Sequence, residues 1–177
     1  SLKLDTSYLN KHSLKIIKYY NLARTLMGSG RFASYKDYGE SIWRIGYGSM
    51  EIHGKVVTSK TRATQEEIDE QLKIDLETLS HKLSKIIHWR LNPKKKAAVI
   101  SYAFSNGFIP FKNSQLFELI NSGCHKKKLV KEWSPFINKV WLNKSDFIID
   151  QRRSELNLFL AADKEVPTFL PHKCKSK

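Results

Sequence analysis

The stretch Tyr35-Lys-Asp-Tyr-Gly-Glu-Ser-Ile-Trp-Arg-Ile-Gly-Tyr-Gly48 decides how this chain folds. Its aromatic and β-branched residues are interrupted by glycines, a pattern typical of a β-hairpin with tight turns. The hairpin follows a long gap in acidic residues, because no Asp or Glu lies between Asp5 and Asp37. We therefore predict two or three short antiparallel strands between residues 31 and 58, with Asp37 as the first carboxylate.

Helical patterns lie on both sides of this hairpin. Apolar residues recur at helical spacing from Ser13 to Met27, and Gly28-Ser-Gly30 then ends the pattern. After the hairpin, Thr64-Gln-Glu-Glu67 is a capping box that predicts a long helix from near Gln65. Further helices are expected at 94–106, after the break at Asn92-Pro93, and at about 114–121, 125–133 and 147–161.

These elements predict an α+β fold with a first helix, a small antiparallel β-hairpin lobe and a mainly helical lobe, with a cleft between the lobes. The expected division of the chain is an N-terminal extension at 1–12, one domain at 13–163 and a Pro/Lys-rich tail at 164–177. No apolar run approaches the roughly 20 residues of a membrane span, and the N-terminus lacks the apolar stretch of a signal peptide. We expect a soluble chain.

Charge indicates the kind of partner. Lys and Arg number 31 against 17 Asp and Glu, which gives a formal net charge of +14. Such an excess favours a polyanionic partner: a cell envelope, a nucleic acid or an acidic protein surface. Nucleic-acid binding is the weakest of these predictions, because the chain contains no zinc-finger, RNP or helix-turn-helix signature.

The cysteines and histidines do not predict a metal site or a cofactor. Cys124 and Cys174 are far apart, without CxxC spacing; two free thiols are the favoured interpretation, and a disulfide holding the tail is the alternative. No paired spacing for zinc or for a Ser/His/Asp arrangement is found among His53, His81, His88 and His125.

The order of the elements resembles that of the phage-type lysozymes, the endolysins and tail lysozymes. The resemblance runs from about Ser13 to Ala162. Beside the hairpin it is carried by the segments Thr64-Gln-Glu-Glu-Ile-Asp-Glu-Gln-Leu-Lys-Ile-Asp-Leu76, Ala97-Ala-Val-Ile-Ser-Tyr-Ala-Phe-Ser-Asn-Gly107, Ser114-Gln-Leu-Phe-Glu-Leu-Ile-Asn-Ser-Gly123 and Arg152-Arg-Ser-Glu-Leu-Asn-Leu-Phe-Leu160, with Trp133 between the last two.

This resemblance implies a lysozyme fold and a muramidase that cleaves the N-acetylmuramic acid to N-acetylglucosamine linkage of peptidoglycan without a metal or cofactor. It also implies a phage-encoded protein, associated with the virion or released from the host cytoplasm to the periplasm or cell wall. Peptidoglycan is the expected partner, and virion or tail proteins are further partners. Outside a virion, we expect a monomer.

The family's catalytic residues are a Glu at the end of the first helix, an Asp in the hairpin and a Thr on its second strand. Asp37 matches the Asp. The Glu position falls on Asn21 when the helix is aligned, or on Gly28 when the spacing to Asp37 is kept. Arg44 takes the place of the Thr, and Ser49 takes a position that is often His.

Glycoside hydrolysis normally needs two carboxyl groups, so this pattern leaves two interpretations. In the first, the hydrolase uses Asp37 and a replacement acid, Glu40, with Glu51 as the other nearby candidate. The residues predicted to contact substrate are then Arg44, Tyr47, Ser49, Phe104 and Asn106. In the second, the fold is catalytically degenerate and serves as a cell-wall-binding or virion structural module.

Some features have ordinary structural explanations as well as functional ones. Trp43, Tyr47 and Phe104 could stack on sugar rings, or they could belong to the core. The basic clusters Lys94–Lys96, Lys126–Lys128 and Arg152–Arg153 could contact phosphate groups, but clusters of this kind usually form solvated helix faces.

Overall fold

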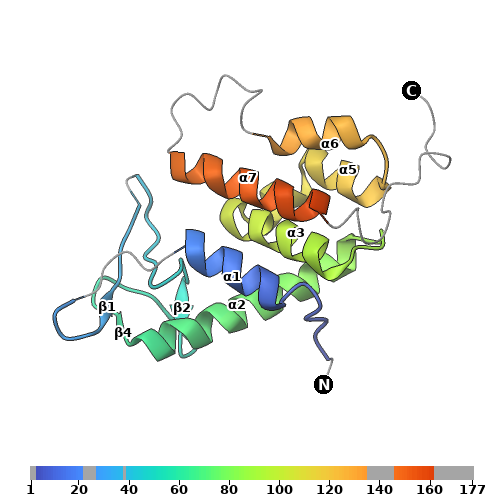
Figure 1. Ribbon diagram of the computed structural model, residues 1–177. Coiled ribbons are helices and arrows are strands. Elements are labelled where there is room, and N and C mark those ends of the chain that lie inside the picture. Colours follow the sequence, from blue (N-terminus) through green and yellow to red (C-terminus); the bar gives the residue numbers. More distant parts are fainter. Residues whose placement is uncertain (1–2, 22–26, 38, 135–145, 162–177) are drawn as a thin grey trace. The chain divides into compact units, whose positions relative to one another are not determined.

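The computed structural model describes residues 3–21, 27–37, 39–134 and 146–161. The chain divides into two compact units, one made of Ser1–Tyr20 with Thr78–Lys177 and the other of Asn21–Glu77. We call them the helical unit and the β unit. Helix α2 (Gln65–Ile86) begins in the β unit and ends in the helical unit (Figure 1).

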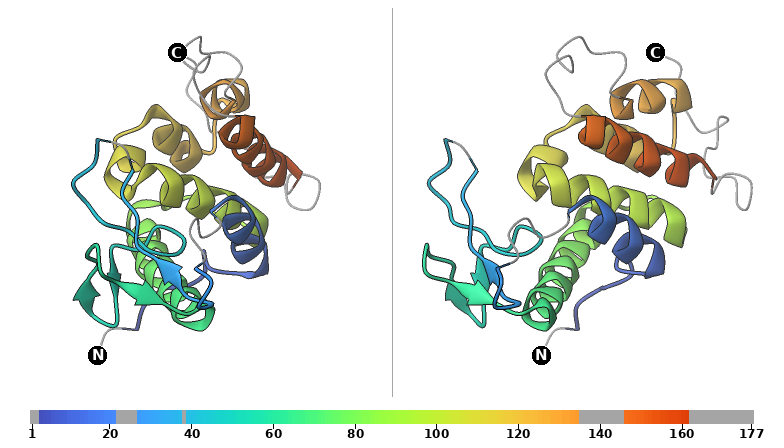
Figure 2. Two further views of the ribbon diagram at one scale, coloured as in Figure 1. Left: turned by 90° about the vertical axis from the view of Figure 1, so that its left-hand side faces the viewer. Right: turned by 60° about the vertical axis from the view of Figure 1, so that its left-hand side comes forward.

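The β unit contains two small antiparallel sheets (Figure 2). Strand β1 (Phe32–Ala33) pairs with β4 (Arg62–Ala63), and β2 (Glu51–Ile52) pairs with β3 (Lys55–Val56). Isolated bridges join Tyr35 to Arg44 and Ile45 to Ser49. The prediction of two or three short antiparallel strands between residues 31 and 58 is confirmed by β1, β2 and β3, whereas β4 lies beyond the predicted region.

The capping box at the start of α2 is confirmed. The Glu67 amide donates to the Thr64 hydroxyl at 3.2 Å, and the Thr64 amide donates to the Glu67 carboxylate at 3.1 Å. His53, in the turn between β2 and β3, also contacts this carboxylate through its Nε2. The hydrogen bond from His53, together with those from Thr64, lowers the pKa of Glu67 to about 2.

The hairpin lies against α2 through a glycine. Gly46 has a φ of 63°, and a Cβ at this position would lie 2.7 Å from the Cβ of Ile68 on α2. Ile45 and Leu72 are fully buried, and Ile68 is 1% exposed. The backbone at Gly46 therefore approaches α2 more closely than any residue with a side chain would allow.

The helical unit is built around α3, which packs against α1, α4 and α7 (Figure 1). Asn92 caps α3 by accepting from the Lys95 amide, and Pro93 occupies its first turn. Small buried residues, Ala97, Ala98 and Ser101 among them, allow the close packing that the sequence predicted. The helices are α1 (Lys11–Tyr20), α3 (Pro93–Asn106), α4 (Phe108–Lys112), α5 (Gln115–Ser122), α6 (Lys126–Trp133) and α7 (Asp146–Ala161).

The structure differs from the predicted helices at two places. Helix α1 ends at Tyr20 rather than at Met27, whose amide instead donates to the Arg31 carbonyl at 2.7 Å across a turn. The sequence did not predict α4, which follows the cap of α3 at Gly107. Helix α1 also begins inside the predicted N-terminal extension, and the predicted tail at 164–177 lies outside the described residues.

The favoured prediction of free thiols was wrong for Cys124, which is disulfide-bonded; Cys174 lies outside the described residues. Among the helices of the described ranges, none is long and apolar enough to cross a membrane.

Two of the basic clusters contain buried side chains. Lys95 is fully buried, with its Nζ 3.7 Å from the centre of the Phe159 ring. Arg152 is 2% exposed and stacks over Tyr102 at 4.8 Å. The solvated-face interpretation was therefore wrong at these two positions, because a cation over an aromatic ring can be accommodated in a core.

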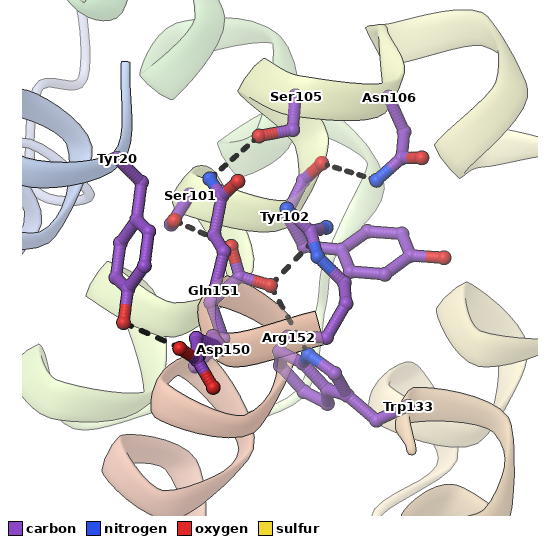
Figure 3. A network of polar contacts seen from close by, with 10 residues as sticks. Tyr20, Ser101, Tyr102, Ser105, Asn106, Trp133, Asp150, Gln151 and Arg152 are labelled. Carbon is purple, nitrogen blue, oxygen red and sulfur yellow. Dashed lines mark hydrogen bonds and ion pairs between the residues drawn. The ribbon is translucent and has the colours of Figure 1, made fainter. Parts of the chain in front are cut away.

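A buried network joins Ser101 of α3, Trp133 of α6 and Arg152 of α7 (Figure 3). The Glu155 carboxylate accepts hydrogen bonds from Ser101 Oγ at 2.5 Å and from Trp133 Nε1 at 3.3 Å. Arg152 Nη1 lies 3.2 Å from the same carboxylate and makes an ion pair without hydrogen-bond geometry. Burial dominates over these partners and raises the pKa of Glu155 to about 7.

We expect replacing Gly46 with Ala to lower the free energy of unfolding by about 2 kcal/mol, because Ala adds both a clash with Ile68 and a positive-φ penalty. Urea denaturation measures this change. Gly54→Ala is the matched control, since Gly54 has a φ of 73° and open space around it. An equal loss in both variants would contradict a packing role for Gly46.

We expect the free energy of unfolding to fall as pH rises from 4.5 toward about 7, the unfolded and folded pKa values of Glu155. Because the pKa of Glu155 is higher in the folded state than in the unfolded state, its protonated form stabilises the fold by about 3 kcal/mol at pH values below the unfolded pKa. This stabilisation is lost as the pH rises through the folded pKa. Glu155→Gln should remove that part of the pH dependence in urea titrations, whereas Asp150→Asn, a surface control on α7, should keep it. An unchanged pH dependence in Glu155→Gln would contradict this assignment.

Candidate active site

Two carboxylates of the hairpin lie in one turn. The bridge between Tyr35 and Arg44 closes the strands with two backbone hydrogen bonds of 2.8 Å. Beyond it, the Glu40 amide donates to the Asp37 carbonyl at 3.0 Å. Asp37 is half-buried and Glu40 is exposed. The structure therefore brings together the two residues that the sequence predicted to be catalytic.

Arg44 holds this turn from the second strand. Its Nε lies 3.6 Å from Glu40 Oε2, and its Nη1 donates to the Gly48 carbonyl at 3.1 Å. One guanidinium thus links the predicted acid to the following turn. The sequence left the acidic partner of Arg44 open between Glu40 and Glu51, and the structure pairs it with Glu40.

Ser49 is buried and faces α2. Its hydroxyl donates to Asp75 Oδ2 at 2.7 Å, and Gln71 Nε2 donates to the other oxygen of Asp75 at 2.8 Å. Burial raises the pKa of Asp75, although both hydrogen bonds oppose that shift. Both carboxylate oxygens of Asp75 therefore accept hydrogen bonds from within the β unit.

Tyr47 also faces α2, with a ring that is 9% exposed. Its hydroxyl donates to Asp69 at 2.9 Å and accepts from Gln65 at 3.2 Å, and burial raises its pKa. Trp43 is half-buried, with Lys36 Nζ 5.2 Å from its ring centre. Only part of each ring is accessible to a ligand.

The α2 partners of this site were not predicted from the sequence. These partners are Asp69, Gln71 and Asp75. The apolar stripe of α2, formed by Ile68, Leu72 and Leu76, is interrupted by two of them, Gln71 and Asp75. A polar residue within a buried stripe was the available signal, because it must find a hydrogen-bond partner.

The other two predicted contact residues lie in the helical unit. Phe104 is half-buried on α3, and Asn106 is the exposed last residue of that helix. Asn106 Nδ2 donates to the Tyr102 carbonyl at 3.0 Å, and Gly107 caps the helix through its amide (Figure 3). Their predicted contact with substrate stays a prediction.

Neither aligned position for the family Glu carries a carboxylate. Asn21 follows α1, and Gly28 lies in the exposed turn before β1. A Cβ at Gly28 would meet no atom within 4 Å. Within the described ranges, no group of three or more His, Cys, Asp or Glu side chains could hold a metal ion.

The family model named Phage lysozyme matches residues 27–155, which is most of the chain. The chain belongs to the phage lysozyme family. This lysozyme is thus a peptidoglycan hydrolase of phage type, a glycoside hydrolase acting on the bacterial cell wall. The family, the α+β lysozyme-like fold and the hydrolase class that the sequence predicted are confirmed.

Solved structures share the fold of this lysozyme. An endolysin from Escherichia coli O157:H7 phage FAHEc1 has a TM-score of 0.68 and 23% identity, over 87% of this chain and 94% of that chain. A mutant of P22 lysozyme has a TM-score of 0.64 and 23% identity, over 86% and 97%. The muramidase domain of SpmX from Asticaccaulis excentricus has a TM-score of 0.59 and 22% identity, over 85% and 96%. None of the curated proteins matches this lysozyme.

Proposed function

We propose that this lysozyme is an endo-acting N-acetylmuramidase in which Asp37 and Glu40 supply the two carboxyl groups. The observation that carries the proposal is the turn in which the Glu40 amide donates to the Asp37 carbonyl at 3.0 Å. Hydrolysis of a glycosidic bond uses one carboxyl group to protonate the leaving oxygen and another to activate water or stabilise the oxocarbenium-like state. Two carboxylates in one turn suit that division of roles.

Glu40 is the proposed acid because it is accessible. Two other carboxylates are engaged elsewhere: Glu155 is fully buried between helices, and Asp75 accepts hydrogen bonds from Ser49 and Gln71. Asp37 would stabilise the transition state or position water. Arg44 would act as a positioning residue, because it contacts both Glu40 and the Gly48 carbonyl.

The remaining assignments also belong to this proposal. Arg44, Tyr47, Ser49, Phe104 and Asn106 would contact the glycan strand, and the formal net charge of +14 suits an anionic cell envelope. Virion or tail proteins are the proposed further partners, and the protein would be monomeric outside a virion.

A second candidate function is a lysozyme fold kept for binding alone. The observation that favours it is the absence of a carboxylate at both Asn21 and Gly28. This candidate requires saturable binding to purified sacculi without release of reducing ends.

Reducing-end release from purified sacculi tests the proposal. We expect Asp37→Asn and Glu40→Gln each to lower the rate by about a hundredfold or more, because each removes a carboxyl group used in the transition state. Glu66→Gln, an exposed glutamate at the start of α2, is the control and should retain the rate. Unchanged release by Asp37→Asn would reject the assignment, and an inactive parent chain would favour the binding function.

Gly28 provides a second test, because its surroundings leave room for a side chain. If Glu40 already serves as the acid, Gly28→Glu and the size-matched control Gly28→Gln should release reducing ends at the same rate. A gain of about tenfold or more confined to Gly28→Glu would contradict the role of Glu40, because a new acid would then be supplying catalysis that the chain lacks.

A further inference from the structure

Helix α1 is basic throughout. It contains Lys11, Lys15 and Lys18 and no acidic residue. These lysines are spaced by four and three residues, so they follow one side of the helix. On the neighbouring helix α7, the carboxylate of Asp150 lies 3.9 Å from Arg153. The region between α1 and α7 therefore favours negatively charged ligands.

An aromatic cluster lies at the end of α1. The Tyr19 and Phe147 rings stack with centres 6.3 Å apart, and the Tyr20 ring lies 4.8 Å from Tyr19 and 5.1 Å from Phe147. Tyr19 is 63% exposed and Phe147 is 47% exposed. Exposed aromatic side chains gathered in one place, unlike single ones, commonly mark a binding surface.

A pocket of about 420 Å³ opens beside this cluster. Its walls include His12, Lys15, Tyr19 and Tyr20 from α1 and Ser154 and Leu158 from α7.

Tyr20 is fixed in the pocket wall. Its hydroxyl lies 2.6 Å from Ser154 Oγ and donates to the Asp150 carbonyl at 3.2 Å (Figure 3). The pocket therefore has an ordered aromatic wall and a cationic edge at Lys15.

We propose that this pocket, formed by α1 and α7 of the helical unit, binds the anionic muramyl-peptide portion of the peptidoglycan strand. Aromatic rings offer flat apolar faces to the carbon-bound hydrogens of a sugar ring, and hydroxyl and ammonium groups at the edge suit its polar substituents. The stem peptide of the muramyl unit carries carboxylates, which complement Lys15 and the neighbouring lysines of α1. The inference rests on the proposed function, because it identifies how the same substrate is held.

The test uses the disaccharide-peptide N-acetylglucosaminyl-N-acetylmuramyl peptide, which lacks the muramic acid to glucosamine linkage that a muramidase cleaves. Binding can therefore be measured on the full active chain without turnover. In a ¹H–¹⁵N NMR titration, we expect saturable shifts at the amides of Tyr19, Tyr20 and Ser154. Chitobiose, an uncharged disaccharide, should bind more weakly at these residues.

Lys15→Gln and Tyr19→Ala should each raise the dissociation constant by about fivefold or more. The matched controls are Lys127→Gln on α6 and Ile109→Ala on α4, both exposed in the helical unit, and they should leave it unchanged. Circular dichroism checks that each variant is folded.

Three results would overturn the inference: shifts confined to other residues, equal binding of chitobiose, or displacement of the muropeptide by phosphatidylglycerol vesicles, which would assign the surface to lipid. If the muropeptide does not bind at this pocket but reducing ends are still released, the inference fails and the proposed function stands. If the chain releases no reducing ends but binds the muropeptide at this pocket, the inference stands and the proposed function fails.

Discussion

The close contact between the Gly46 backbone and Ile68 sets the arrangement of the β unit, because every functional side chain of the second hairpin strand is placed relative to it. Tyr47 and Ser49 follow Gly46 at alternate positions and both reach α2, at Asp69 and Asp75 respectively. The bridge between Ile45 and Ser49 closes the turn that contains Gly46 and Tyr47. This turn presents Tyr47 and Ser49 to α2 together, so both hydrogen bonds form.

The carboxylates of this lysozyme differ chiefly in burial. Glu155 is enclosed by aromatic rings and by Arg152, and its pKa is raised to about 7. Asp75 is partly buried and held by two neutral donors. Asp37 and Glu40 lie instead in a turn that is more open to solvent. This accessibility is the reason that we propose Asp37 and Glu40 for the chemistry, whereas Glu155 and Asp75 have their oxygens engaged inside the protein.

The helical unit places cations in two different settings. Lys95 and Arg152 lie in the core over Phe159 and Tyr102, where ring faces take the place of water. Lys15 lies on the surface at the edge of an aromatic pocket. The same residue types therefore lie in the packing of α3 against α7 and at the edge of the surface that we propose for an anionic polymer, and burial separates the two settings.

The sequence by itself determined what depends on near neighbours. The capping box at Thr64 and Glu67 joins residues three positions apart, so it was predicted together with the fold class and with the break at Asn92-Pro93. Only the tertiary structure decided the Ser49 to Asp75 hydrogen bond, the burial of Arg152 and the disulfide at Cys124. These features depend on segments far apart in the chain, and local propensity carries no information about which distant group will be near.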